Sequence, residues 1–547
     1  MSRWDNAAVY QIYPKSFCDS NGDGVGDITG VISKLDYIQK LGVDMIWLSP
    51  IYLSPGMDNG YDVSDYDAID PIFGSEQDFD ALIAQAHKRD LGIMMDLVLN
   101  HTSSEHPWFL DARSDRSSEN RDYYIWRDPK SDGGLPNNWM NIFGTGPAWT
   151  FDSGTGQYYL HLFSEYQPDL NWENAAVRQE LYAMIRRWIQ RGVDGFRLDV
   201  ISCISKPQGL PDSPGGNAMA AAANGPRVHE FLREMRREAF GSADLMTVGE
   251  AAGVDIPSAM RYASLDRAEL DMVFHFEVND LDGGESGKWN ERRISAADHF
   301  NVLSKWQIAL QGKAGNSLYL SNHDQPRAVS RYGSEGALRE RSAKMLAVFA
   351  YFMCGVPYIY QGEELGMTNT QFSDSSQLRD IEGIDAFKRM GADERALRII
   401  NLKGRDPART PMQWSSERNA GFSAGEPWIC MNPNYTEINA EDQESDENSV
   451  LNFYRKLLTL RKKCADAVAG VFTPLTPEDA SNVFAYKREP EDGGSSLLII
   501  CNYGETDATL HIDTSGYYIL LTNTGREQLG KDDLLLPYEA VVMVNRR

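Results

Sequence analysis

The chain is poor in cysteine for its length. Only six of its 547 residues are cysteines, and none of them forms a Cys-x-x-Cys pair. Scattered cysteines in a chain this long do not indicate a disulfide framework. We therefore expect buried free thiols at all six positions, which are Cys18, Cys203, Cys354, Cys430, Cys464 and Cys501.

The chain also lacks a hydrophobic run long enough to cross a membrane. The longest uncharged apolar run, 345–360, is interrupted by Gly355 and Pro357 and is too short to span a bilayer. The first ten residues, MSRWDNAAVY, do not combine a charged segment with an apolar one, as a signal peptide would. We expect a cytoplasmic protein with no membrane partner.

Positive charge is the third shortage. Lysine and arginine total 53 residues against 79 aspartates and glutamates, which gives a formal net charge of −26. Such a surface disfavours nucleic acids and anionic membranes as partners. It fits a globular protein, monomeric or weakly homo-oligomeric, that acts on a small neutral molecule such as an oligosaccharide.

Short apolar runs, several of which end in polar residues, recur along most of the chain. Helix-period segments, such as 28–41, 75–90, 175–191 and 337–352, lie between most of them. Strands that alternate with helices predict a parallel sheet, and eight strands favour a (β/α)8 TIM barrel of the α/β class. The eight predicted strands are 8–13, 44–48, 92–99, 193–200, 245–250, 272–276, 316–321 and 355–360.

The spacing of these segments also predicts the domain organisation. Residues 102–172 contain no helix–strand unit of the barrel, and about 70 residues is long for a plain loop, so we expect an inserted subdomain after strand 3. Short alternating runs from residue 471 predict a C-terminal antiparallel β domain, a β-sandwich over 471–547. The barrel would then comprise 1–101 and 173–470.

Three acids stand at the ends of predicted barrel strands: Asp199, Glu250 and Asp324. In a TIM barrel, residues distant in sequence converge at the carboxyl ends of the strands. Arg197 lies two residues before Asp199 and would share its face of the strand, lowering its pKa. Glu250 has no basic residue nearby in sequence, so we expect a proton donor there. Retaining glycoside hydrolysis needs such a pair, although Arg197 and Asp199 alone would also suit a structural ion pair.

An early loop carries oxygen donors at alternate positions. Asp19, Asn21, Asp23, Val25 through its carbonyl, and Asp27 resemble the first part of an EF-hand loop, but Gly30 stands where the usual last acidic ligand would be. We expect a structural Ca²⁺ site, with Mg²⁺ as an alternative ion and a metal-free turn as the alternative structure.

Taken together, these residues resemble the α-amylase family, family 13 of the glycoside hydrolases. The segments DLVLNH (96–101), QPDLNW (167–172), GFRLDV (195–200), VGEA (248–251) and SNHDQP (321–326) are similar to its motifs in order and spacing. The resemblance implies Asp199 as nucleophile, Glu250 as acid/base and Asp324 as transition-state stabiliser. It also implies a sugar-binding set of Tyr61, Asp62, His101, Phe163, Arg197, Val200, His323 and Arg409.

Within this family, the segments QIYPKSFCDSNGDGVGD and GRDPARTPMQW are most similar to oligo-1,6-glucosidases and dextran glucosidases. In such relatives a valine at the position of Val200 accompanies α-1,6 preference. The resemblance thus implies an exo-acting α-glucosidase for isomaltose, panose and short dextran fragments. Alternatives are a broader α-glucosidase for sucrose, isomaltulose or trehalulose, a trehalose-6-phosphate hydrolase, and, more remotely, a non-catalytic binding relative. Val200 would also suit simple strand packing.

Overall fold

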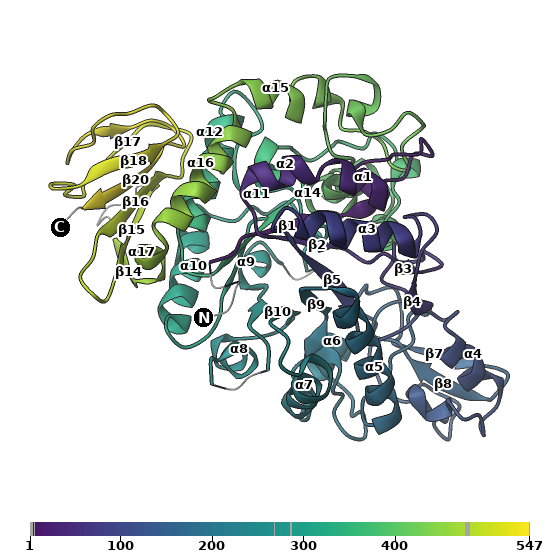
Figure 1. Ribbon diagram of the computed structural model, residues 1–547. Helices are drawn as coiled ribbons and strands as arrows, with labels where there is room; N and C mark the ends of the chain where they lie inside the picture. Colours follow the sequence, from purple (N-terminus) through teal and green to yellow (C-terminus); the bar gives the residue numbers. More distant parts are fainter. Residues whose placement is uncertain (1–3, 5, 267–268, 285–286, 476–481, 546–547) are drawn as a thin grey trace.

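The computed structural model describes residue 4 and residues 6–266, 269–284, 287–475 and 482–545. Eight parallel strands form one sheet in the order β11-β10-β9-β5-β2-β1-β13-β12. Each of the eight predicted runs contains one of these strands, so the predicted TIM barrel is confirmed (Figure 1). The strands are β1 (Val9–Ile12), β2 (Met45–Leu48), β5 (Gly92–Val98), β9 (Gly195–Asp199), β10 (Met246–Glu250), β11 (Met272–Phe274), β12 (Ser317–Tyr319) and β13 (Val356–Tyr360).

Side chains bridge the two ends of this strand order, β11 and β12. The Ser317 hydroxyl donates to the Val273 carbonyl at 2.8 Å, and the Tyr319 hydroxyl donates to the His275 carbonyl at 2.6 Å. The barrel is therefore nearly closed. Its interior is filled by buried residues from alternate strand positions, as expected of a packed barrel core: Val9, Met45, Trp47, Met94, Met246, Val248, Met272, Phe274, Val356 and Tyr358.

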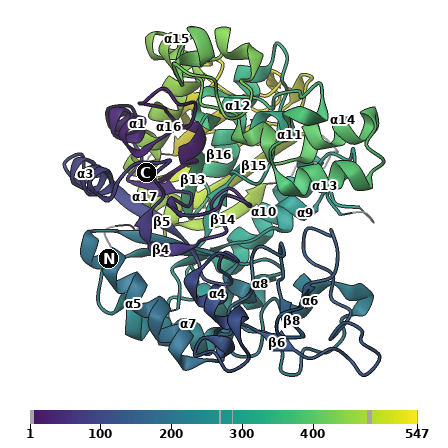
Figure 2. The same cartoon turned by 90° about the vertical axis from the view of Figure 1, so that its right-hand side faces the viewer.

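Helices cover the outside of the barrel (Figures 1 and 2). The predicted helix 28–41 is two helices, α1 (Ile28–Ser33) and α2 (Leu35–Leu41), because Lys34 has non-helical backbone angles. The other predicted barrel helices are α3 (Glu76–His87), α5 (Ala175–Arg191) and α12 (Arg339–Tyr351). The remaining α-helices are α4 (Pro107–Ser114), α6 (Ala218–Ala222), α7 (Val228–Met235), α8 (Ile256–Ala263), α9 (Glu277–Asp280), α10 (Ala296–Leu310), α11 (Ala328–Tyr332), α13 (Ile381–Arg389), α14 (Glu394–Lys403), α15 (Ala440–Ser445), α16 (Val450–Lys463) and α17 (Ala465–Ala469).

Helix α5 shows how the sequence sets the boundaries that place the next strand. The Asn174 side chain accepts a hydrogen bond from the Ala176 amide and caps the first turn. Gly192, in the left-handed region at φ 107°, ends the helix. The chain then enters β9, whose last residue is Asp199.

A small antiparallel sheet lies between β5 and α5, where the insertion was predicted. It consists of β6 (Trp126–Arg127), β8 (Gln157–Leu160) and β7 (Trp149–Asp152). Lys206 connects the end of this insertion to the barrel, because its ammonium lies 2.6 Å from Asp169 Oδ2 and 2.7 Å from Asn100 Oδ1. Earlier in the chain, β3 (Tyr52–Leu53) and β4 (Asp65–Ile69) pair as a separate two-stranded sheet.

The C-terminal strands are antiparallel, as predicted for the fold class. A five-stranded sheet has the order β14-β15-β16-β20-β18, and β17 pairs with β19. Of the segment 471–547, residues 476–481 and 546–547 lie outside the described residues. The strands are β14 (Val471–Leu475), β15 (Val483–Glu489), β16 (Ser496–Asn502), β17 (Ala508–Thr509), β18 (Tyr518–Thr522), β19 (Leu534–Leu535) and β20 (Ala540–Asn545).

The structure can be compared with two further expectations, which concern the cysteines and membrane-spanning segments. All six cysteines are free, but Cys354, Cys430 and Cys464 are only partly buried, so the expectation of burial is wrong for these three. Among the described residues, no helix is both long and apolar enough to cross a membrane.

Candidate active site

The three predicted catalytic acids all follow or end barrel strands at one end of the sheet. Asp199 is the last residue of β9, and Glu250 is the last residue of β10. Asp324 lies in the turn after β12. Because the strands are parallel, their carboxyl ends meet at the same mouth of the barrel.

One guanidinium joins two of these acids. Arg197 Nη1 donates to Asp199 Oδ1 at 2.6 Å, and Arg197 Nη2 donates to Glu250 Oε2 at 2.5 Å. Arg197 Nη1 also donates to Asp96 Oδ1 in β5 at 2.7 Å. Three carboxyl groups therefore share a single buried cation.

This crowding changes the predicted electrostatics of Asp199. Burial raises the pKa of Asp199 well above its usual value; Arg197 opposes that shift, while Glu250 and Asp96 add to it. Burial likewise raises the pKa of Asp96 to about 6. The prediction that Arg197 gives Asp199 a low pKa is therefore wrong, because burial outweighs the effect of the shared arginine. Asp199 and Asp96 therefore retain a proton more readily than exposed carboxyl groups would.

The surroundings of Glu250 also differ from the prediction. No basic residue lies near Glu250 in the sequence, but Arg197 reaches it from the neighbouring strand. The Val200 amide donates to the same Oε2 atom at 3.0 Å. Val200 follows the strand and has φ 35° and ψ 39°, in the left-handed region that a β-branched residue rarely adopts. Val200 therefore lies outside the strand, although its side chain is buried.

Asp324 is surrounded by cationic and polar groups. Arg409 Nη2 lies 2.7 Å from Asp324 Oδ1, and Arg405 Nη1 lies 3.4 Å from the same oxygen. Burial alone would raise the pKa of Asp324, but His323, Arg405 and Arg409 outweigh it and lower the pKa. Asp324 is thus held ionised, unlike the group around Asp199.

Tyr61 connects the two groups of acids. Its hydroxyl lies 3.0 Å from Asp96 Oδ2 and 2.6 Å from His323 Nε2. Its ring is nearly parallel to that of His323, with the centroids 5.3 Å apart. The Tyr61 carbonyl lies 3.0 Å from His101 Nε2. Tyr61, His101 and His323 therefore belong to one hydrogen-bonded network.

Two further predicted residues lie around this network. Phe163, half-buried, packs against His101 with ring centroids 5.2 Å apart. Asp62 is fully buried and accepts hydrogen bonds from the Ser54 hydroxyl at 2.9 Å and from the Met57 amide at 2.9 Å. These bonds hold the loop that carries Tyr61.

Sequence reasoning missed several residues of the site. Asp96 is the first residue of the DLVLNH motif, but no role was predicted for it. An acid in an otherwise apolar strand was the signal that could have identified it. Arg405, four residues before the predicted Arg409, lies 2.7 Å from Asp380 through its Nη2 atom. Asp380 accepts from the Gly383 amide as the N-cap of α13, and its sequence context did not indicate the site because its cationic partners, Arg405 and Arg409, lie more than twenty residues away.

The predicted metal loop is hydrogen-bonded largely within itself. Asp19 Oδ1 accepts from the Gly22 amide at 2.7 Å, and Asp23 Oδ1 accepts from the Val25 amide at 2.9 Å. The Asp27 carboxylate caps α1 through the Gly30 amide. The described residues hold no group of three or more His, Cys, Asp or Glu side chains arranged for a metal ion. The available donors are all oxygens, however, which suits a hard cation.

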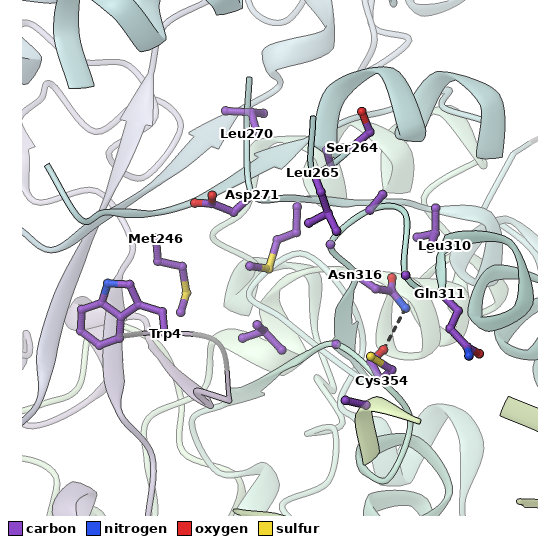
Figure 3. A pocket seen from close by; sticks show the side chains of 18 of the residues that line it. Trp4, Met246, Ser264, Leu265, Leu270, Asp271, Leu310, Gln311, Asn316 and Cys354 are labelled. Atoms are coloured by element: carbon purple, nitrogen blue, oxygen red, sulfur yellow. Dashed lines mark hydrogen bonds between the residues drawn. The ribbon is translucent and has the colours of Figure 1, made fainter. Parts of the chain in front are cut away.

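Two of the hollows among the described residues bear on the location of the site. A cleft of about 600 Å³ borders the acids through Glu382, which lies 3.4 Å from Arg405, and is lined by Phe143, Lys288, Trp289 and Arg389 among others. A second cavity, of about 380 Å³, lies at the opposite, amino-terminal ends of the strands, beside Trp4, Met246 and Asn316 (Figure 3). Only the first adjoins the candidate site.

Comparisons with known proteins agree with this geometry. The alpha-amylase catalytic domain model matches residues 11–470. An oligo-1,6-glucosidase of Parageobacillus thermoglucosidasius is 50% identical over 98% of each chain, and a trehalose-6-phosphate hydrolase of Bacillus subtilis is 46% identical over 98% of this chain and 97% of its own. The crystal structure of a Bacillus licheniformis trehalose-6-phosphate hydrolase mutant is 45% identical, covers 100% of both chains and has a TM-score of 0.96.

The family match covers most of the barrel, and the relatives match nearly the whole chain. The three acids at the carboxyl ends of the strands stand within the matched region. This chain belongs to the alpha-amylase family and is a glycoside hydrolase.

Proposed function

We propose that the protein is a retaining, exo-acting α-glucosidase that releases glucose from the non-reducing end of α-1,6-linked isomaltooligosaccharides. The observation that carries the proposal is the pairing of Asp199 and Glu250 on one guanidinium. A single guanidinium between them fits the carboxyl separation of about 5–5.5 Å in retaining enzymes, rather than the wider gap of inverting ones. The similarity to oligo-1,6-glucosidases supports the substrate class.

In the first step, Asp199 attacks the anomeric carbon while Glu250 protonates the glycosidic oxygen. The bond to the leaving sugar breaks, and a glucosyl ester forms on Asp199. This step requires a protonated Glu250 and an ionised Asp199, and Arg197 favours the ionised form of Asp199 against the effect of burial. Arg197, bonded to both acids, orients them toward the same bond.

In the second step, the Glu250 carboxylate takes a proton from water, whose oxygen attacks the anomeric carbon and releases Asp199. Two inversions give net retention. Asp324, held ionised by Arg405 and Arg409, accepts hydroxyl hydrogens of the distorted sugar and stabilises its positive charge. His101, His323, Tyr61, Asp62 and Phe163 complete the wall around that sugar.

Initial glucose release from isomaltose, maltose, sucrose and trehalose-6-phosphate at equal concentration tests the proposal. Isomaltose should be the fastest substrate. Faster maltose or sucrose would support the broader α-glucosidase instead. Exclusive turnover of the phosphorylated sugar would favour the trehalose-6-phosphate alternative, for which the cleft offers Lys288, Arg389 and Arg395 as cations around Glu382.

Val200 is expected to set linkage preference. Its backbone amide touches Glu250, so its side chain stands beside the acid that protonates the leaving group. Val200→Ala should lower the ratio of isomaltose to maltose turnover by about 10-fold, since small apolar groups in a pocket are worth that much in discrimination. Val200→Thr, which keeps the volume and adds a hydroxyl, separates volume from polarity. An unchanged ratio in both variants would contradict this role.

We also propose that the loop of Asp19, Asn21, Asp23, the Val25 carbonyl and Asp27 binds Ca²⁺, with Mg²⁺ as the alternative ion. Binding to the folded state alone should raise stability, by about 2.7 kcal/mol when the free ion is at 100 times its Kd. Thermal unfolding with EDTA and with each ion measures this gain. Asp23→Ala should abolish it, while Asp513→Ala, which alters another exposed aspartate in a similar turn, should not. An ion-independent unfolding temperature would contradict the site.

A further inference from the structure

His323 has hydrogen-bond partners at both ring nitrogens. Gln11, in β1, places its amide nitrogen 2.8 Å from His323 Nδ1. Gln11 and His323 are each 1% exposed, so water does not compete for this contact. An amide nitrogen only donates, so His323 Nδ1 must accept, and a neutral ring then carries its proton on Nε2.

The other side of the ring independently favours the same proton position. His323 Nε2 lies 3.4 Å from Asp324 Oδ2, and an ionised carboxylate can only accept. It also lies 2.6 Å from the Tyr61 hydroxyl, which can accept this hydrogen while it donates its own to Asp96 Oδ2, 3.0 Å away. A ring protonated only on Nδ1 would turn a lone pair toward Asp324.

The ring is neutral at ordinary pH, so the choice of nitrogen matters. Burial lowers the pKa of His323 to about 3; Asp324 opposes the shift, and three arginines add to it. Tyr13 also stacks on the ring, at 6.2 Å between centroids. The titratable and charged groups that face His323 are therefore Tyr13, Tyr61, Asp324, Arg197, Arg405 and Arg409.

We propose that Gln11 is a positioning residue that fixes His323 as the Nε2–H tautomer, so that the ring donates toward Asp324 and Tyr61. This inference rests on the proposed function, in which Asp324 holds the reacting sugar. It gives β1, which carries none of the predicted acids, a residue that positions a side chain of the active site. Gln11 also lies 3.4 Å from the Ser49 hydroxyl, so a purely structural role is the alternative.

Two substitutions of nearly equal size separate these roles. Gln11→Glu replaces the donor by a carboxylate, which can only accept, so a neutral His323 must move its proton to Nδ1. Gln11→Met keeps the volume without a hydrogen bond and does not impose either tautomer. Thermal unfolding of both variants measures how far each substitution changes stability, separately from its effect on catalysis.

The first readout is the nitrogen chemical shifts of His323 in protein labelled with ¹⁵N-histidine, assigned with His323→Asn. The expected result is protonated Nε2 and unprotonated Nδ1 in the wild type, and protonated Nδ1 in Gln11→Glu. Protonated Nδ1 in the wild type would overturn the proposal. This measurement needs no substrate, so it stands or fails separately from the proposed function.

The second readout is the pH profile of kcat. Gln11→Glu should lower kcat about 100-fold near neutral pH, the loss typical of a misplaced reacting group, with a smaller change in KM. As pH falls, the new carboxylate favours a doubly protonated ring, which regains Nε2–H, so part of the loss should recover. Gln11→Met should lower kcat less and show no such recovery. Equal losses in both variants, with profiles of wild-type shape, would overturn the proposal.

Discussion

Asp199→Ala is expected to lower kcat for isomaltose by about 10⁴-fold or more while the protein stays folded. The substitution removes the atom that forms the glucosyl ester, and loss of a nucleophile typically abolishes all but residual catalysis. It also removes one of three carboxyl groups from a single buried arginine. Steady-state rates with isomaltose, together with the unfolding temperature, measure both effects.

A reaction with azide distinguishes loss of the nucleophile Asp199 from loss of Asp96, the neighbouring acid on the same arginine. In Asp199→Ala, azide can enter the vacated space and attack the anomeric carbon directly, giving the β-glucosyl azide by a single inversion. Asp96→Ala, which removes a second acid on the same arginine, leaves the nucleophile in place and should not yield that product. Formation of an α-glucosyl azide by Asp199→Ala, or hydrolysis by this variant at the wild-type rate, would contradict the assignment of Asp199 as the nucleophile.

Glu250→Gln should have the second largest effect, and its size should depend on the leaving group. An amide cannot protonate the departing sugar, so kcat/KM for isomaltose should fall about 10³-fold or more. 4-Nitrophenyl α-glucoside needs no proton to release its phenolate, so its first step should be affected far less. Rates with the two substrates, measured across pH, give the comparison.

The pH profile supplies the control for this variant. The alkaline limb of kcat/KM reports the acid of the free enzyme and should disappear in Glu250→Gln. Asp324→Asn retains Glu250 and should keep that limb while slowing both substrates alike. Equal losses for isomaltose and the nitrophenyl substrate in Glu250→Gln would show that Glu250 does not donate the proton.

The sequence predicted the barrel well because each strand is an apolar run next to a helical one, and parallel strands bring their polar ends together. Asp199, Glu250 and Asp324 could be located for that reason alone. Residue spacing could not predict how cations are shared across strands. Arg197 is two residues from Asp199, but it also bonds Asp96 and Glu250 from neighbouring strands. Burial, with these two neighbouring acids, outweighs the arginine and raises the pKa of Asp199.

Backbone conformation at the end of a strand was the second feature that could not be predicted from the sequence. Val200 has a strong strand propensity, yet it leaves the strand in a left-handed conformation that points its amide at Glu250. Propensity describes an isolated segment, and here tertiary contacts override it. Gln11 was likewise not recognised, because a lone glutamine in a strand carries no signal until the fold brings His323 to within 2.8 Å.

The central claim is retention at an α-1,6 linkage, and one NMR experiment tests it directly. Methyl α-isomaltoside and methyl α-maltoside, mixed at equal concentration, release glucose only from their non-reducing ends. The account predicts that the isomaltoside disappears first and that α-glucose appears before mutarotation produces the β anomer. Early β-glucose would contradict the double displacement on Asp199, and faster loss of the maltoside would contradict the α-1,6 preference.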